Sequence, residues 1–265
     1  AQTAATRLAE LGYTDISLLA GGLQGWRAAG FEIFRDVNSP SKAFGELVEA
    51  RQHTPSLSAE EVKALIDTKA NIVIVDARRY EEFQTMSIPT AESAPGGELV
   101  YRLQELADRP TTRVIVNCAG RTRGIIGTQS LINAGLPNPV SALRNGAIGW
   151  KLAGLILDHG SQHETPPPNA TYRAQAAAAS RHVADAAKVG RTSLEAVEIW
   201  QKTTSRTVSR FAVSPPLEFS EGHIAGFRSA PRGQLVQETD MFAPVKGAII
   251  VLAVCIDRLR NRRGT

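Results

Sequence analysis

Residues 114–123 read Val-Ile-Val-Asn-Cys-Ala-Gly-Arg-Thr-Arg, and this stretch is the most informative part of the sequence. The apolar run 114–117 is typical of a short buried strand, and the pattern over 124–134 predicts a helix that ends at Gly135. Cys118 therefore lies at a corner between a strand and a helix. The backbone N–H groups of such a turn converge on one point, where they favour negative charge.

This corner is suited to a sulfur nucleophile. We expect the converging amides to lower the pKa of the Cys118 thiol, so that the nucleophilic thiolate predominates. Arg121 and Arg123 add positive charge and forked donors that fit an oxyanion. Cations at the start of a helix oppose its dipole, and an anionic ligand would remove that penalty. Phosphate ester transfer, arsenate reduction and sulfur transfer all use a cysteine in such a turn.

The loop and its surroundings resemble the rhodanese (thiosulfate sulfurtransferase) family, whose active loop runs over six residues from its cysteine. Phosphatases and arsenate reductases of the same fold have a loop one residue longer, so the resemblance favours sulfur over phosphorus. Three other segments match the family in order: 73–78, with its strand ending in Asp-x-Arg; 80–89, with Glu-Phe and Ile-Pro; and 145–154, with the closing glycines and tryptophan. Matches in sequence order are more specific than any single motif.

The chain departs from the family pattern at three places. Met86-Ser87 stand where Gly-His is usual, Asn145 replaces a glycine, and Leu155-Ile156 follow where proline is common. We expect these changes to affect the rim of the site and to leave the Cys118 loop untouched.

The resemblance implies that Cys118 takes the outer sulfur of thiosulfate as a persulfide and passes it to cyanide or a thiol. The residues implied in substrate binding are those of the loop, Ala119, Gly120, Arg121, Thr122 and Arg123. Among them, Arg121 is expected to hold the sulfonate, Arg123 to assist, and Thr122 to donate its hydroxyl to the persulfide.

Asp76 and Arg78 are interpreted as structural support, an ion pair beneath the loop. Trp26 and Trp150 are interpreted as core anchors. Two alternatives stay open: a non-catalytic rhodanese scaffold or sulfur relay, and a phosphatase or arsenate reductase of the same fold.

Internal repetition organises the whole chain. Gly22 and Trp26 return as Gly146 and Trp150, a shift of 124 (146 − 22), and segment 82–97 returns at 218–233, a shift of 136 (218 − 82). We therefore expect five parts: 1–34, the C-terminal part of one repeat; 35–56, a connector; 57–159, a complete rhodanese domain; 160–190, a linker and helix; and 191–265, the N-terminal part of a further, degenerate repeat. Cys255 in that last part is expected to be inactive.

The fold class predicted is α/β, a rhodanese-like parallel sheet with helices on both faces, because strand and helix patterns alternate in the complete repeat. The ranges expected are helices 58–68, 98–107 and 122–134 and strands 71–76, 113–117 and 140–143. Helices are also expected at 41–51 and 172–189, and a strand at 247–254. Active residues of such sheets lie beyond the carboxyl ends of the strands.

Composition narrows the function classes. Lysine and arginine number 30 against 26 aspartates and glutamates, a net charge of +4, and we expect no nucleic-acid partner. Two cysteines without paired spacing argue for a reducing, cytoplasmic location. The sequence contains no run of eighteen apolar residues, so no membrane partner is expected. The histidines lack metal-ligand spacing and no nucleotide loop is present, so neither metal nor cofactor is expected. The oligomeric state is left open.

Overall fold

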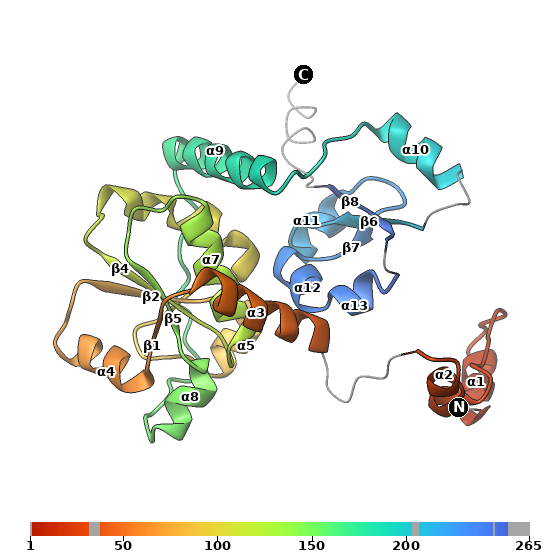
Figure 1. Cartoon of the computed structure of the whole chain (residues 1–265), viewed down its shortest axis with the longest axis horizontal. Helices are drawn as coiled ribbons and strands as arrows, with labels where there is room; N and C mark the ends of the chain where they lie inside the picture. Colours follow the sequence, from red (N-terminus) through yellow and green to blue (C-terminus); the bar gives the residue numbers. More distant parts are fainter. Residues whose placement is uncertain (1, 32–37, 203–206, 246, 254–265) are drawn as a thin grey trace. The chain divides into compact units, whose positions relative to one another are not determined.

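The computed structural model describes residues 2–31, 38–202, 207–245 and 247–253 (Figure 1). The chain divides into two compact units, Ala1–Ser39 and Pro40–Thr265. The five-part domain division stays a prediction, and Cys255 lies outside the described residues. Within the described residues, no helix is both long enough and apolar enough to cross a membrane.

The second unit is built around a five-stranded parallel sheet of order β1-β5-β4-β2-β3. Its strands are β1 (Ser56–Leu57), β2 (Ile72–Asp76), β3 (Glu92–Ser93), β4 (Arg113–Asn117) and β5 (Val140–Leu143). The helices of this region are α3 (Ser39–Gln52), α4 (Ala59–Asp67), α5 (Tyr80–Thr85), α6 (Leu99–Arg102), α7 (Thr122–Asn133), α8 (Gly146–Leu152) and α9 (Ala170–Ala186), with 3-10 turns η1 (Gly96–Glu98) and η2 (Leu103–Asp108).

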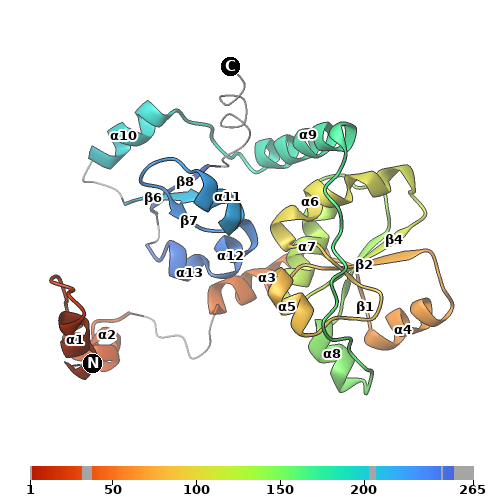
Figure 2. The same ribbon diagram turned by 180° about the vertical axis from the view of Figure 1, so that it is seen from behind.

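Both faces of this sheet are buried, because alternate residues of its central strands enter two different clusters. Val116 of β4 packs with Leu99 of α6 and Leu131 of α7. The neighbouring Ile115 packs with Phe83 of α5 and Trp150 of α8 on the opposite face. Figures 1 and 2 show the two helical layers. The predicted α/β class, with a parallel sheet between helices, is confirmed.

The helix expected at 98–107 is wrong in detail, since only residues 99–102 are α-helical and 3-10 turns flank them. Leu103 and Leu106 are both buried in one cluster. A spacing of three residues places both side chains on one face of a 3-10 turn, which has three residues per turn. Packing therefore selects the tighter helix here.

A second, three-stranded sheet repeats part of the first. Its order is β7-β6-β8, formed by β6 (Val208–Ala212), β7 (Arg228–Ser229) and β8 (Ile249–Ala253). Val75 pairs with Glu92 as Phe211 pairs with Arg228, a shift of 136 (211 − 75) that also relates β4 to β8 (249 − 113). The surrounding helices are α10 (Leu194–Lys202), α11 (Pro216–Glu221), α12 (Arg232–Gln237) and α13 (Thr239–Phe242). The 136-residue repeat is thus a repeat of strand register.

The first unit contains α1 (Gln2–Glu10) and α2 (Gly22–Ala28). The bounds of α2 and α8 differ by 124 (146 − 22), and each helix follows a left-handed residue, Gly21 or Asn145. The tryptophans differ in burial, however: Trp150 is fully buried, while Trp26 is 39% exposed. The expectation that Trp26 is a core anchor is wrong, because its own unit has no described sheet strand to cover it.

This contrast predicts unequal effects of one substitution at two equivalent positions. We expect Trp150→Ala to lower the free energy of unfolding by about 3–5 kcal/mol, because it empties a packed site. Trp26→Ala is expected to cost about 1 kcal/mol or less, because its side chain is already 39% exposed to water. Urea unfolding followed by circular dichroism measures both, and equal losses would contradict the assigned burial.

Candidate active site

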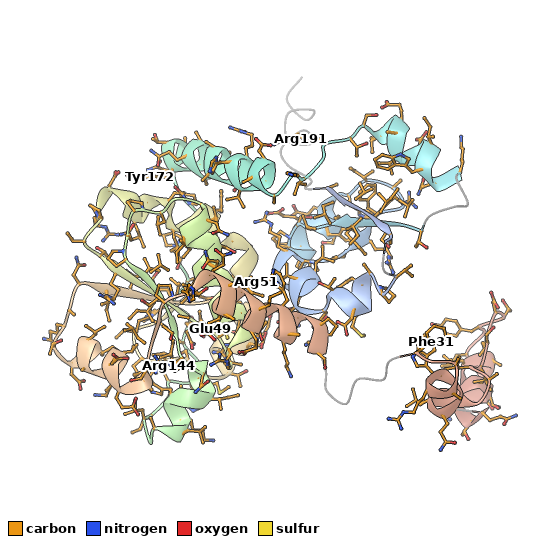
Figure 3. All side chains as sticks on the ribbon, in the orientation of Figure 1. Phe31, Glu49, Arg51, Arg144, Tyr172 and Arg191 are labelled. Carbon is orange, nitrogen blue, oxygen red and sulfur yellow. The ribbon has the colours of Figure 1, made fainter. Side chains whose placement is uncertain are left out.

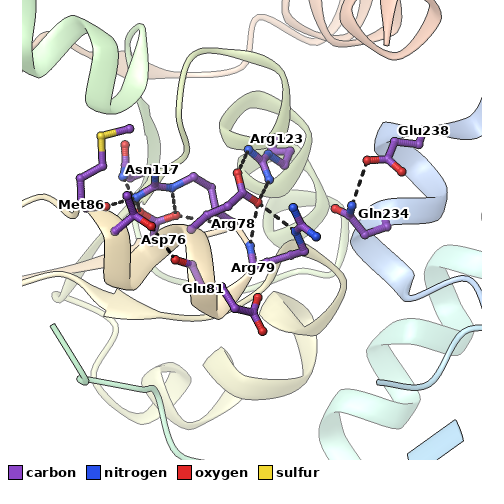
Figure 4. Close-up of polar contacts among 11 residues, drawn as sticks. Asp76, Arg78, Arg79, Glu81, Met86, Asn117, Arg123, Gln234 and Glu238 are labelled. Carbon is purple, nitrogen blue, oxygen red and sulfur yellow. Dashed lines mark hydrogen bonds and ion pairs between the residues drawn. The ribbon is translucent and has the colours of Figure 1, made fainter. Parts of the chain in front are cut away.

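A buried ion pair closes the carboxyl ends of the two central strands. The Asp76 carboxylate accepts hydrogen bonds from Arg78 Nε at 2.9 Å and Arg78 Nη2 at 2.8 Å. Asn117 Nδ2 donates to the same carboxylate at 2.8 Å, across from β4 (Figure 4). All three residues are buried. Arg78 also donates to the carbonyl of Met86. The predicted pair is present, and it ties both strands together directly before Cys118.

The Cys118 loop is held from the other side by α8. The amides of Ala147 and Ile148 donate to the carbonyls of Cys118 and Ala119, each at 2.9 Å. Gly146 has a φ of +54°, and a Cβ there would lie 2.2 Å from the Cys118 carbonyl oxygen. Only glycine permits this close approach, and its positive φ also favours glycine. The closing segment of the domain is therefore a clamp on the loop.

The sulfur of Cys118 lies within the loop and is closed off from solvent, with the residue 2% exposed. The prediction of a lowered pKa is wrong: burial raises the pKa of the Cys118 thiol. The amides of Gly124 and Gly120 and the charge of Arg123 lower the pKa, but their combined effect is smaller. The surroundings of the thiol are polar, as expected, yet the neutral form predominates at neutral pH.

Arg123 is bound by a carboxylate of the protein itself. Its Nη1 and Nη2 donate to the two oxygens of Glu82 on α5, at 2.8 and 2.9 Å (Figure 4). Burial alone would raise the pKa of Glu82, but Arg123, with help from Arg79, lowers it to about 2. The same contact raises the pKa of Arg123 despite its burial. Both groups are therefore ionised in the folded protein.

Arg121 is likewise paired, here with α3. Its Nε and Nη2 donate to Glu46 at 2.7 and 2.9 Å, and Nη2 also contacts Glu49. The hydrogen bond from Arg121 lowers the pKa of Glu46. Asn145 Oδ1 accepts from Nη1 at 3.5 Å. Asn145, one of the departures from the family pattern, therefore contacts the Cys118 loop. The expectation that these departures leave the loop untouched is wrong at this position.

Helix α3 is fixed against the beginning of α7. A Cβ built at Gly45 would lie 3.0 Å from Thr122 Cγ2 and 3.2 Å from Thr122 Cα. Just beyond α3, Thr54 Oγ1 donates to Gln129 Oε1 of α7 at 2.9 Å, and both residues are buried. Glu49, labelled in Figure 3, lies in the second half of α3 and pairs with Arg121. The segment expected only as a connector therefore supplies two side chains to the loop.

The structure thus brings together Cys118 and the whole 119–123 loop, with Asp76 and Arg78 beneath it. Sequence reasoning missed the three carboxylates that hold the two arginines. Glu82 lies in a segment already matched to the family, which is a usable signal. Glu46 and Glu49 stand three apart on one face of a predicted helix, but nothing local indicates which element that face meets.

Comparison with known proteins gives the family of this domain. Residues 58–153 match the family model of the rhodanese-like domain. A crystal structure of thiosulfate sulfurtransferase from Pseudomonas aeruginosa is 60% identical, with a TM-score of 0.84, over 95% of this chain. The chain spans 48% of the length of that protein.

A second similar protein is the HTH-type transcriptional regulator Rv0324 of Mycobacterium tuberculosis. It is 34% identical over 91 residues, which are 34% of this chain and 39% of the regulator. The similarity covers only part of each protein, and it indicates no more than that the two share a domain.

The clamp at Gly146 can be tested against a matched glycine. Gly154 also has a positive φ, +76°, but a Cβ there would meet nothing within 4 Å. We expect Gly154→Ala to cost about 1–2 kcal/mol of backbone strain. Gly146→Ala should cost about 3 kcal/mol or more, because the main chain of the loop must also move. Denaturant unfolding of both variants measures the difference, and similar costs would argue against the clamp.

The depressed pKa of Glu82 predicts an acid-dependent stability. Its pKa lies below the usual value, so the stabilisation is complete above the unfolded pKa and is lost as pH falls towards about 2. Glu82→Gln should lower the free energy of unfolding by roughly 2 kcal/mol near neutral pH, and the difference should shrink below about pH 4. Glu81→Gln, at the exposed neighbour, is the control. A pH-independent difference in urea unfolding would contradict the assignment.

Proposed function

Because the chain is a member of the rhodanese family, with its rhodanese-like domain at residues 58–153, we propose that it is a sulfurtransferase whose carrier is Cys118. The observation that carries the proposal is the geometry of the loop. Cys118 follows β4 directly, and the amides of Gly120 and Gly124 are directed at its sulfur. Four residues separate Cys118 from Arg123, which is the family's sulfur-transferring loop length.

The first step is attack of the Cys118 thiolate on the outer sulfur of thiosulfate. A new S–S bond forms, the bond between the two sulfurs of thiosulfate breaks, and sulfite leaves with the electron pair. The thiol proton is released to water beforehand. In the second step a nucleophilic acceptor, cyanide or a thiol, removes the outer sulfur and regenerates the thiolate. The loop amides stabilise the negative persulfide as they would an oxyanion.

The raised pKa of the thiol shapes this chemistry. In the closed site the thiolate is a minor species, so the rate depends on how the site stabilises the anion once the donor enters. The persulfide that forms carries its charge on the outer sulfur, one atom further from the backbone of Cys118. The charge of Arg123, which lies nearby, favours both anions.

The loop residues differ in how they could contact the donor. Arg121 is partly exposed and can meet the sulfonate, whereas Arg123 is more buried beneath it. Thr122 and Ala119 line the same turn, so their amides and the Thr122 hydroxyl are the remaining donors that we assign to the substrate. The free thiol of Cys118 must persist between cycles, and we therefore place the reaction in a reducing compartment such as the cytoplasm.

A second candidate function is a non-catalytic rhodanese module. The observation that favours it is the burial of Cys118, because a thiol without access to solvent behaves as a small core residue. In that case the domain would bind a partner without transferring sulfur. The same experiment distinguishes the two functions.

We expect the protein, incubated with thiosulfate and analysed as the intact chain, to gain about 32 Da, the mass of one sulfur atom, as a persulfide. Cyanide should remove that mass, and thiocyanate should appear in the same amount. Cys118→Ser should gain nothing while keeping its fold. Absence of the gain in the unsubstituted protein with thiosulfate, at several pH values, would favour the non-catalytic module.

A further inference from the structure

The two arginines of the loop, which are expected to bind an anionic donor, are already paired with carboxylates of the protein. Arg121 is contacted by Glu46 and Glu49, and Arg123 by Glu82. Arg79 also donates to Glu82, so that carboxylate is shared by two arginines. At Arg121, by contrast, one guanidinium group faces two carboxylates, a local charge close to −1 (1 − 2), whereas the loop sequence alone has two positive charges.

The two arginines differ in how they could be released. The Arg123–Glu82 pair is bidentate and largely buried, and it lies inside the sheet domain between α5 and α7. The Arg121 group is 36% exposed and Glu46 is 53% exposed, so water and solutes reach this pair. An incoming anion can compete for Arg121 without breaking the domain core, because exposed ion pairs are weak.

The backbone of α3 is anchored to the rest of its unit. Gly45 lies against Thr122, and Thr54 bonds to Gln129 of α7. At the start of α3, Ser41 Oγ donates to the carbonyl of Gln237 at 2.6 Å. The helix is therefore anchored on both sides of Glu46 and Glu49, which keeps both residues within reach of Arg121.

We propose that Glu46 and Glu49 determine the donor specificity of the site: they compete with the donor for Arg121 and disfavour a dianion more than a monoanion. This inference rests on the proposed sulfurtransferase function. Thiosulfate, with two negative charges, must displace the carboxylates and then remain close to them. A thiosulfonate monoanion presents the same outer sulfur with half the charge, so it meets less repulsion. The substrate class favoured by the chain is thus a sulfane-sulfur donor of low negative charge.

The test compares thiosulfate with methanethiosulfonate as donors and cyanide as acceptor, in steady state. For Glu46→Gln, Glu49→Gln and the double variant, we expect the KM for thiosulfate to fall, by roughly three- to tenfold in the double variant. The KM for methanethiosulfonate should fall by about twofold or less, with kcat nearly unchanged for both donors. The full chain is used throughout.

Glu81→Gln is the matched control for the single variants, because it removes one exposed carboxylate from α5 without touching Arg121. It should leave the KM ratio of the two donors unchanged. An unchanged or raised KM for thiosulfate in the α3 variants would overturn the inference, as would an equal fall for both donors. In those cases a persulfide on Cys118 would still support the proposed function. If neither donor yields a persulfide in any protein, the proposed function itself fails.

Discussion

The register between β2 and β4 positions the whole candidate site. It sets Asp76 opposite Asn117, so that the amide of one strand reaches the carboxylate of the other. A buried carboxylate needs such partners, and Arg78 supplies the remainder. Because Cys118 follows Asn117 immediately, fixing the ends of these strands also fixes the position of the Cys118 backbone. A slip of one residue would turn the apolar residues of β4 to the wrong faces.

Much of the fold could be predicted from the sequence, because local pattern and packing agree. Strands 113–117 and 140–143 were expected with the bounds that they have, and the 136-residue repeat was visible before its register was known. What failed depended on packing at a distance. The tight turns around Leu103 follow from the cluster beneath them, and Trp26 repeats the local geometry of Trp150 without the sheet that buries it.

The site shows the same division. The loop, the Asp76–Arg78 pair and the position of Cys118 follow from motifs, whereas the charge state of the thiol does not. The sequence pattern shows the amides and arginines that favour a thiolate, but not the burial that opposes it. Nor does it show that α3 turns Glu46 towards the loop. An anionic ligand was expected to balance the loop arginines, but the chain itself supplies carboxylates, two of them from the segment expected as a connector.

The two sheets of the chain share one register, so β8 could pair with β2 in place of β4 during folding. Each could align with β2 without any slip, and repeats of this kind are prone to misassembly. The strand ends discriminate between them. Where β4 ends in Asn117, β8 ends in Ala253, and its own partner β6 ends in Ala212. In a β2–β8 mispairing, the buried charge of Asp76 would lie against a methyl group. The polar cluster beneath the loop therefore also disfavours the wrong strand pairing.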